Sequence, residues 1–293
     1  MELNYDYPVY RPPSEANSMI FQVTLGCSFN KCSFCNMYRT KDYSERPWEE
    51  IKMEIDISSK YYPETTRIFL ADGDALNLSV ERLTQILDYL YQKFPSLERV
   101  SSYAMPKNLL QKSDSELQLL KKAGLNMFYV GLESGNDIVL KKVTKGATYK
   151  SIVQACNKAR NNDFILSCMV ILGLGGTIYT KDHIEDTAKI LGEISPDYVG
   201  ALNLHLEEGV YEEFMAKYNE PFTFLDDIQV LDELDRLISN INPFRPIIFR
   251  ANHASNVYSI KGTLPEDKEN ILNLIRNLKN HPEMLKPKIL RRF

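Results

Sequence analysis

The chain has 293 residues, a formal net charge of −4, 44% hydrophobic residues and 25% charged residues. These proportions are those of a globular protein, and an α/β barrel of this length forms one domain. Because there is no basic excess, we do not expect a nucleic-acid partner. No apolar run approaches the ~20 residues that span a bilayer, and the N-terminus lacks the form of a signal peptide. We therefore expect a cytoplasmic protein without a membrane partner.

Short β-prone runs alternate with amphipathic helical patterns along the first 205 residues. The β-prone runs predict strands at 19–25, 67–71, 98–103, 126–132, 164–172 and 197–204. The helical patterns lie between them, at about 47–60, 79–93, 114–123, 148–161 and 181–193. Most strands start roughly 30 residues after the previous one, which is the length of a βαβ unit.

Several helix ends carry their own signals. Ser79 is a plausible N-cap, the segment from Ser113 to Glu116 has the form of a capping box, and Gly124 is typical of a helix C-terminus. Beyond residue 205 the pattern loosens. There we expect helices at about 208–219 and 226–240, a strand at 247–250 and a last helix near 265–279.

The βα repeats predict a parallel sheet with outer helices. The run 164–172 is apolar without alternation, which is typical of a strand buried on both faces. Periodicity alone leaves open an open doubly wound sheet or a full or partial barrel. In each case the loops at the carboxyl ends of the strands form the site. We expect an N-terminal extension (1–16), a core (17–205) and a C-terminal extension (206–293) that packs on the core.

Three cysteines, Cys27, Cys32 and Cys35, follow the first predicted strand within nine residues. Three thiolates on one loop can bind a [4Fe–4S] cluster through three irons and leave the fourth iron open. Structural zinc is the alternative, but it needs a fourth ligand. The four histidines lie far away in sequence and none has zinc-finger spacing. We expect the other two cysteines, Cys156 and Cys168, to be small buried residues rather than ligands.

The strand, the following glycine and a three-cysteine loop with an aromatic residue before its last cysteine resemble the radical SAM superfamily. The usual spacing of that family is three residues and then two between the cysteines. Here the first gap has four residues, 28–31, and variants of this spacing are found in the superfamily.

Three further segments resemble the same family, and together the match covers about residues 17–205. Residues 71–74 look like the Gly-Gly-Glu-like turn that receives the amino group of S-adenosylmethionine (SAM). Residues 129–135 are similar to the Gly-x-Glu-Ser segment of elongator-type and methylthiotransferase-like members, which approaches the SAM ribose and methionyl groups. Residues 171–176 are similar to the strand end beside adenine. The cofactor-binding residues that the resemblance implies are Phe34, Asp72, Gly73, Asp74, Glu133, Ser134, Leu172 and Gly173.

The resemblance implies a partial (β/α)6 TIM-like barrel with a C-terminal helical extension. It also implies that SAM chelates the fourth iron of the cluster. Reductive cleavage of SAM would then give methionine and a 5′-deoxyadenosyl radical that abstracts hydrogen from a substrate. Such a radical needs a dry, enclosed site. Phe34, Met37, Tyr38 and Tyr103 are apolar or aromatic residues that would close the barrel interior.

The residues that act on the substrate are unknown from the sequence. Asn203 and His205 alternate at the end of a predicted strand, and a polar run follows the last short strand from Arg250. A strand histidine is more often simply hydrogen-bonded, and the polar run serves equally well to hold the C-terminus. The candidates are Tyr103, Asn203, His205, Arg250, Asn252 and His253.

These observations favour an oxygen-sensitive radical SAM enzyme with one cluster, an unidentified small-molecule substrate and an electron donor such as flavodoxin or ferredoxin. Two alternatives stay open. One is an enzyme of the same superfamily that modifies RNA or another macromolecule, and the other is a non-enzymatic zinc or iron–sulfur binding module. Metal analysis and a SAM cleavage assay distinguish such a binding module from a radical SAM enzyme.

Overall fold

The structure is a computed structural model that describes residues 5–291. It divides into two compact parts. Within the described residues, the first part consists of 5–30, 35–130 and 155–166, and the second part of 31–34, 131–154 and 167–291.

The first part is built on parallel strands in the order β1, β4, β5, β6. Their bounds are β1 Met19–Gln22, β4 Arg67–Ala71, β5 Arg99–Tyr103 and β6 Leu125–Glu133, of which β6 continues into the second part after Val130. A short antiparallel pair joins β2 (Thr24–Leu25) to β3 (Ser44–Glu45). Because β1, β4 and β5 are parallel, the loops that follow them emerge at the same edge. The helices are α1 Trp48–Tyr61, α2 Val80–Lys93, α3 Pro106–Gln111 and α4 Asp114–Lys122, with 3-10 turns η1 Pro13–Glu15 and η2 Ala75–Asn77.

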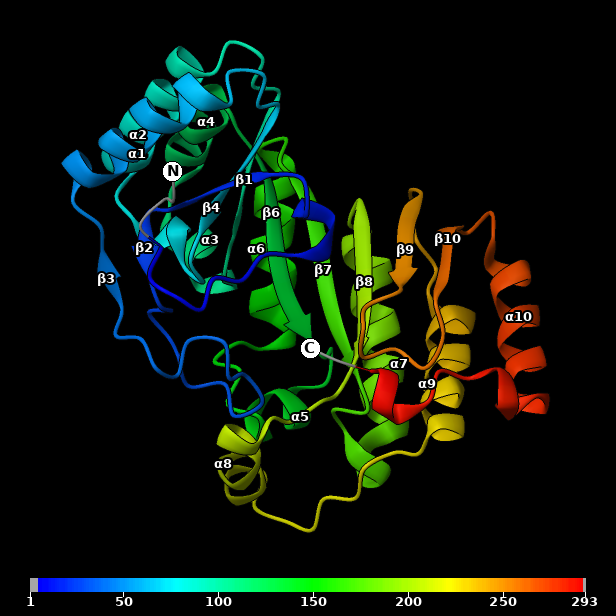
Figure 1. The fold of residues 1–293 in the computed structure, drawn as a ribbon. Helices are drawn as coiled ribbons and strands as arrows, with labels where there is room; N and C mark the ends of the chain where they lie inside the picture. The colour runs from blue at the N-terminus through cyan, green and yellow to red at the C-terminus, as the bar shows by residue number, and fades with distance from the viewer. Residues whose placement is uncertain (1–4, 292–293) are drawn as a thin grey trace. The chain divides into compact units, whose positions relative to one another are not determined.

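The second part contains three parallel strands and a final antiparallel one, β10, which pairs with β9. The strands are β7 Ile165–Leu172, β8 Tyr198–Asn203, β9 Ile247–Ala251 and β10 Ile260–Leu264. Helix α9 packs against α7 and against α10, and α10 lies beside β10 (Figure 1). The helices are α5 Asp137–Lys142, α6 Tyr149–Asn161, α7 Gly176–Ile194, α8 Glu208–Tyr218, α9 Asp227–Asn240 and α10 Lys268–Asn280, with 3-10 turns η3 Pro282–Met284 and η4 Lys288–Leu290. Helix α6 continues into the first part from Ala155, and β7 enters the second part at Ser167.

The signals for helix ends are confirmed. The Ser79 side chain accepts a hydrogen bond from the backbone of Arg82, and Ser113 and Glu116 form the reciprocal capping box. Gly124 follows α4 with a φ of +102°, a conformation that glycine adopts without a steric penalty. Cys156 and Cys168 are both fully buried, as expected.

Five elements differ from the sequence prediction. The predicted strand 19–25 is interrupted at Val23, and α7 begins at Gly176, five residues before its predicted start. The first turn of α7 is rich in Gly, Thr, Ile and Tyr, which have weak helix propensity, so its periodic pattern starts late. Helices α3 and α5 have six residues each, too few to show a helical period. Strand β10 has Gly262 at its centre and only two buried residues, so pairing with β9 rather than composition defines it.

The protein therefore has an α/β fold with mostly parallel strands, as predicted. No residue of β7 is exposed, in line with its continuous apolar sequence. In the described part of the chain, every helix is too short or too polar to cross a membrane. The predicted domain bounds stay a prediction.

Candidate functional site

In the first part, the cysteine loop and the turn after β4 are hydrogen-bonded to each other. The backbone N–H of Gly73 donates to the carbonyl of Gly26 at 3.1 Å, and the N–H of Gly26 donates to Asp72 Oδ2 at 3.1 Å. Gly26 has a φ of +70°, which turns the chain directly before Cys27. The loop that carries the first cysteine is thus fixed onto the acidic turn.

Gly73 is in close contact with its neighbours in this arrangement. A Cβ added at Gly73 would lie 2.5 Å from Cε2 of Tyr38 and 3.2 Å from Cβ of Cys27. Any side chain at this position would therefore displace the Tyr38 ring. Only glycine allows the turn to lie flat between the ring and the cysteine.

Asn30 accommodates the long first gap between the cysteines. Its φ is +39°, in the left-handed region that asparagine tolerates better than most residues. Its side-chain amide donates to the carbonyl of Tyr38 at 2.7 Å, and its own carbonyl accepts from Arg39 at 2.9 Å. These bonds hold the start of the loop to the segment that follows Cys35.

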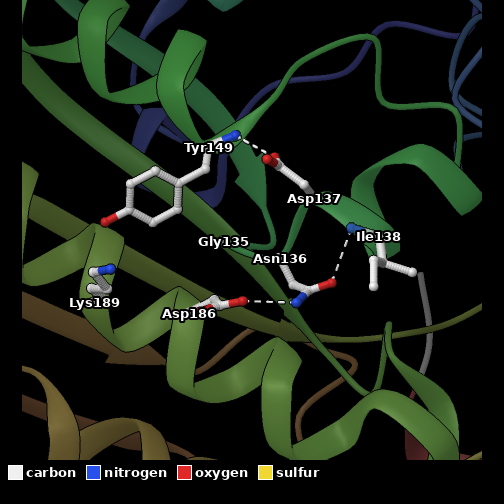
Figure 2. Close-up of a pocket in the computed structure, with 7 residues that line it drawn as sticks. All are labelled: Gly135, Asn136, Asp137, Ile138, Tyr149, Asp186 and Lys189. Carbon is white, nitrogen blue, oxygen red and sulfur yellow. Dashed lines mark hydrogen bonds between the residues drawn. The ribbon is translucent and has the colours of Figure 1, made fainter.

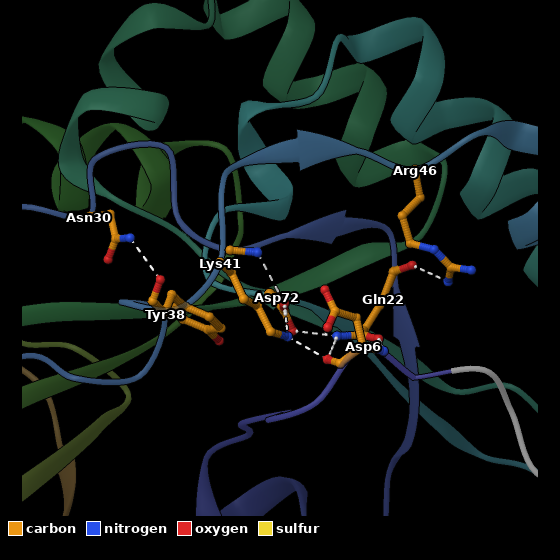
Figure 3. A network of polar contacts seen from close by, with 8 residues as sticks. Asp6, Gln22, Asn30, Tyr38, Lys41, Arg46 and Asp72 are labelled. Atoms are coloured by element: carbon orange, nitrogen blue, oxygen red, sulfur yellow. Dashed lines mark hydrogen bonds and ion pairs between the residues drawn. The ribbon is translucent and has the colours of Figure 1, made fainter.

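Asp72 is fully buried and lies in a network of polar contacts (Figure 3). Lys41 Nζ lies 2.9 Å from Asp72 Oδ2, and Gln22 donates to Oδ1 at 3.0 Å. Lys41 also donates to the carbonyl of Asp6. Since both carboxylate oxygens of Asp72 already have partners, its contacts are those of a residue that fixes the turn.

Asp74 has a different environment from Asp72. It is fully buried, and its Oδ2 accepts a hydrogen bond from the Ser28 hydroxyl, while Oδ1 has no partner among the described residues. Burial raises the pKa of the Asp74 carboxyl above its usual value, although the bonds from Ser28 oppose this effect. An unpartnered buried carboxylate oxygen is a site where a cationic ligand would be stabilised.

Two aromatic side chains lie near the first and third cysteines. Tyr103 packs edge-on against Phe69, with ring centroids 5.0 Å apart. Burial raises the pKa of Tyr103 well above its usual range, and the charges of Tyr129 and Cys35 add to the effect. Burial likewise raises the pKa of Tyr38, with smaller contributions that include Cys35 and Cys27. Both phenols therefore stay protonated at neutral pH.

In the second part, the segment with Cys32 packs on the loop after β6. The N–H of Ser33 donates to the carbonyl of Val143 at 3.0 Å. Phe34 packs against a buried apolar cluster, and Lys145 Nζ lies 6.0 Å from the centre of its ring. The buried residues of this cluster are Val139, Val143, Leu174, Phe214 and Tyr218.

Glu133 ends β6 in a strained conformation. Its φ is +65°, which is uncommon for a residue with a side chain and is often found at functional sites. Its carboxylate forms an ion pair with Lys145 at 2.9 Å and lies over Gly131, where an added Cβ would come within 2.0 Å of Oε1. Glu133 is thus held in a salt bridge at the end of β6.

Ser134 is buried in a hydrogen-bond chain with His183 of α7. His183 Nε2 lies 3.0 Å from the carbonyl of Ile171, so this nitrogen carries a proton, and Nδ1 is then the acceptor for Ser134 Oγ at 2.8 Å. Burial lowers the pKa of His183 to about 4, which keeps the ring neutral. Since Ser134 Oγ also accepts from the N–H of Asn136, the contacts of Ser134 are structural.

The strand end Leu172–Gly173 is held by a buried acid from α9. Gly173 has a φ of +81°, and its N–H donates to Glu233 Oε2 at 2.6 Å, while Thr180 donates to Oε1 at 2.8 Å. Burial raises the pKa of Glu233 from 4.5 to about 7. A protonatable group thus fixes the backbone of this turn.

The substrate-side candidates fall into two groups. Asn203 is the last residue of β8 and accepts a hydrogen bond from Asn256, and the backbone N–H of Asn203 donates to Ser255. His253 lies 3.0 Å from the same Ser255, so this loop and the end of β8 meet. His205 lies beyond the end of β8 and is exposed, so it does not share a strand face with Asn203 as predicted.

The remaining candidates have simpler surroundings. Arg250 donates to the carbonyls of Phe249 and Gly262, which ties it to β9 and β10. Asn252 is exposed, and Tyr103 belongs to the first part. Burial lowers the pKa of His253, and the charge of Lys286 adds to this, so its imidazole is neutral at pH 7.

A pocket of about 240 Å³ in the second part begins at Gly135, directly after the predicted residue Ser134 (Figure 2). Asn136 donates to Asp186 across it at 2.7 Å, and Asp137 accepts from the N–H of Tyr149 at 2.6 Å. None of the predicted site residues lines this pocket. Its lining consists of Gly135, Asn136, Asp137, Ile138, Tyr149, Asp186 and Lys189.

The fold and these loops define an α/β protein in which cysteine and acidic loops follow parallel strands. The chain belongs to the radical SAM superfamily, whose family description matches residues 21–191. It is 25% identical over 193 residues to the heme chaperone HemW of Bacillus subtilis (strain 168), covering 65% of this chain and 50% of that protein. It is 21% identical over 287 residues to 4′-phospho-dehydrooxetanocin synthase of Priestia megaterium, covering 89% of this chain and 36% of that protein. The chain thus spans half or less of the length of these relatives.

Solved structures share the fold. Coproporphyrinogen III oxidase (HemN) from Escherichia coli matches with a TM-score of 0.57 and 17% identity, covering 76% of this chain and 51% of that one. Methylornithine synthase (PylB) matches with a TM-score of 0.54 and 14% identity, covering 78% and 63%. The likeness to these two structures shows the fold, so the predicted fold class is confirmed.

Members of this superfamily use a [4Fe–4S] cluster and SAM, as the sequence predicted, and typically need a reductant such as flavodoxin or ferredoxin. The residues present fit these groups. The five cysteines form no disulfide, and Cys27, Cys32 and Cys35 are all partly accessible. In the described chain no three His, Cys, Asp or Glu side chains are already grouped to hold a metal ion. The fit therefore depends on three features. The cysteine sulfurs are the soft ligands that iron–sulfur clusters take, Gly73 has no side chain where it lies against Tyr38 and Cys27, and Asp74 has an unpartnered oxygen.

Sequence reasoning did not identify three residues that support the site: Lys41, His183 and Glu233. Two of them carried a signal. Glu233 lies on the apolar stripe of α9 with Val230 and Leu237, where an acid is out of place. His183 lies on the buried face of α7. Lys41 had no such signal, because its partner Asp72 is distant in sequence.

Proposed function

We propose that this chain is a radical SAM enzyme that reductively cleaves SAM to a 5′-deoxyadenosyl radical and abstracts hydrogen from a small-molecule substrate. One observation carries the proposal. Asp74, with its unpartnered buried oxygen, lies on a turn that contacts the Cys27 loop. An ammonium group bound to Asp74 would thus be placed beside a cluster ligand, as chelation of SAM requires.

The three thiolates of Cys27, Cys32 and Cys35 would hold the cluster. When bound, the cluster supplies one electron to the sulfonium of SAM. Three protein ligands leave one iron for the amine and carboxylate of the methionyl group. The extra residue in the first gap is compatible with this role, because Asn30 turns the loop through its left-handed conformation.

Gly73 and Asp74 would bind the methionyl end of SAM. The carboxylate of Asp74 accepts from the ammonium group, and Gly73 allows backbone approach because it has no side chain. Asp72 serves a supporting role, because both of its oxygens are engaged by other groups. Ammonium binding favours the charged carboxylate and offsets the desolvation that raises the pKa of Asp74.

The second part carries the residues that we propose for the nucleoside end of SAM. Of the residues that we propose for adenine, Phe34 has a partly exposed ring, and Leu172 and Gly173 are buried at the strand end. Glu133, strained and paired with Lys145, would accept from a ribose hydroxyl or the methionyl amine. Ser134 orients the loop through His183 instead of binding SAM directly.

The subgroup, the substrate and the partners belong to the same proposal. The segment from Gly131 to Ser134 supports the elongator-type and methylthiotransferase-like subgroup. The net charge of −4 supports a small substrate over a nucleic acid, and the matches favour neither alternative weighed above.

We propose that Asn203 and the loop from His253 bind substrate, because they meet at the end of β8. Residues 17–205 would form the catalytic core, with 1–16 and 206–293 as extensions. A flavodoxin or ferredoxin would be the electron donor, and cluster chemistry favours the reducing cytoplasm.

The test is anaerobic reconstitution with iron and sulfide, followed by SAM and dithionite. We expect an absorbance band of a [4Fe–4S] cluster and formation of 5′-deoxyadenosine. Both should be lost in Cys27→Ala, Cys32→Ala and Cys35→Ala, and kept in Cys156→Ala, whose cysteine is buried in α6. Zinc in place of iron, or a cluster with bound SAM that yields no 5′-deoxyadenosine, would refute the proposal.

A further inference from the structure

Tyr38 carries a buried hydroxyl without a partner. Its side chain is 4% exposed, and its Oη has no hydrogen-bond partner among residues 5–291. Burying a hydroxyl in this state costs about 1–3 kcal/mol. Buried polar groups in native proteins nearly always have a partner, so each exception calls for one. The phenol is therefore placed to bond with a group that arrives after folding.

The position of the Tyr38 ring is fixed by its surroundings. The backbone carbonyl of Tyr38 accepts from Asn30 Nδ2 at 2.7 Å and from the N–H of Lys41 at 3.1 Å. Gly73 lies directly against the ring, and Tyr10 packs on it edge-to-face with centroids 5.7 Å apart. The hydroxyl consequently has little freedom to find another partner.

The groups near the hydroxyl indicate its partner. The charges that act on the Tyr38 phenol are those of Tyr103, Asp72, Cys35 and Cys27, all in the first part. The Asp72 carboxylate is already engaged by Lys41, Gln22 and the N–H of Gly26. Burial raises the pKa of Tyr103, so its phenol keeps its proton and stays neutral. The Cys27 and Cys35 sulfurs are the two groups of this set that would gain negative charge when they bind iron.

We propose that the Tyr38 hydroxyl donates a hydrogen bond to a sulfur of the cluster, on the side held by Cys27 and Cys35. This inference rests on the proposed function, because it requires that these cysteines bind the cluster. One-electron reduction places additional negative charge on the sulfurs while the phenol keeps its proton. The hydrogen bond therefore stabilises the reduced cluster more than the oxidised one. Tyr38 thus makes the cluster easier to reduce.

The test compares cluster-loaded wild type, Tyr38→Phe and Tyr89→Phe in the absence of SAM. Tyr89 is the matched control, because its hydroxyl donates to Asp56 at 2.7 Å on the helix side of the first part. Redox titration followed by electron paramagnetic resonance should give a more negative midpoint potential for Tyr38→Phe alone. In addition, a proton coupling that exchanges in D₂O should be present in the reduced wild type and lost in Tyr38→Phe. Iron and sulfide content should be equal in all three.

Other results would overturn the inference. Equal potentials and an unchanged proton coupling in fully loaded proteins would show that the hydroxyl does not contact the cluster. A change in SAM affinity alone, measured in a separate titration of the loaded proteins with SAM, would show that the hydroxyl serves SAM. If Tyr38→Phe failed to fold, the hydroxyl would have a partner in the apoprotein after all. Removal of an unpartnered buried hydroxyl should leave the apoprotein as stable or more stable. If the wild type bound no iron at all, the proposed function would fail as well, a result distinct from equal potentials.

Discussion

The turn after β4 and the turn after β7 both place a glycine at the carboxyl end of a parallel strand, yet their polar groups differ. Beside Gly73, Asp74 keeps one carboxylate oxygen without a partner, and the Tyr38 hydroxyl is likewise unpartnered among the described residues. Beside Gly173, the Glu233 carboxylate binds the backbone N–H through one oxygen and Thr180 through the other.

This difference separates a ligand-binding turn from a supported one. Unpartnered buried groups lower the stability of the empty protein and gain bonds only when a ligand binds. A carboxylate whose oxygens are both engaged contributes to the fold instead. Substitutions in the first turn at Asp74 should therefore act on binding, whereas those at Glu233 or at the Asp72 network should act on folding.

The largest effect should come from Lys41→Met. The Lys41 and Asp72 side chains are 3% and 0% exposed, so the substitution leaves a buried carboxylate without its cation. Breaking a buried pair in this way costs about 3–5 kcal/mol. Urea denaturation should show a loss of this size, and Lys41→Met/Asp72→Asn should recover part of it. A loss below about 1 kcal/mol would show that Asp72 does not depend on Lys41.

Glu233 should make stability depend on pH in the second turn. Its folded pKa of about 7 exceeds its ordinary 4.5, so the folded state holds the proton more tightly. The contribution is complete below pH 4.5 and is lost as the pH rises to 7, by up to about 3 kcal/mol at ~1.4 kcal/mol per pH unit. In Glu233→Gln the amide oxygen can accept from the Gly173 N–H while the amide nitrogen donates to the Thr180 hydroxyl, so both contacts are kept and the slope should be removed. Equal slopes in wild type and variant, measured by urea denaturation at pH 5 and pH 8, would rule out the effect.

Asp74→Asn should weaken SAM binding while leaving the fold intact. A hydrogen bond to a charged group is worth about 1.5–3 kcal/mol, which corresponds to roughly 10–100-fold in affinity. Because the pKa of Asp74 is raised, wild-type affinity should fall as the pH decreases and the carboxyl becomes neutral. The variant should lack this dependence. Isothermal titration of the cluster-loaded proteins measures both, and Asp114→Asn, on the first turn of α4, is the control.

The sequence was sufficient to predict the elements that have a strong local pattern. The strands around 67–71 and 164–172 and the caps at Ser79 and Ser113 depend on residues that are neighbours in the chain. The short helices α3 and α5 and the strand β10 depend on tertiary contacts, which no short-range period reveals.

The same limit applies to the site. The cysteine spacing and the Gly-x-Glu-Ser segment are local, so they could be recognised from the sequence. By contrast, the sequence did not distinguish Asp72 from Asp74, because both are acids in one turn. Their roles differ through Lys41 and Ser28, which lie 31 and 46 residues away in the chain.

The two glycines themselves offer the finest comparison. In Gly73→Ala the new Cβ would lie 2.5 Å from the Tyr38 ring, so the cost is steric and about 1–3 kcal/mol. In Gly173→Ala the nearest atom is Leu204 Cβ at 3.7 Å, and the cost of about 1–2 kcal/mol comes from a φ of +81°.

A second substitution separates these two mechanisms. Tyr38→Leu should relieve part of the loss in Gly73→Ala, because it removes the ring that the new methyl group meets. Tyr38→Leu should not relieve the loss in Gly173→Ala, since backbone strain does not depend on that ring. Double-mutant cycles from thermal unfolding of the apoproteins measure both couplings. Additive losses in the Gly73→Ala cycle would show that the Tyr38 ring moves aside freely. The space around Gly73 would then be no more restricted than the space around Gly173.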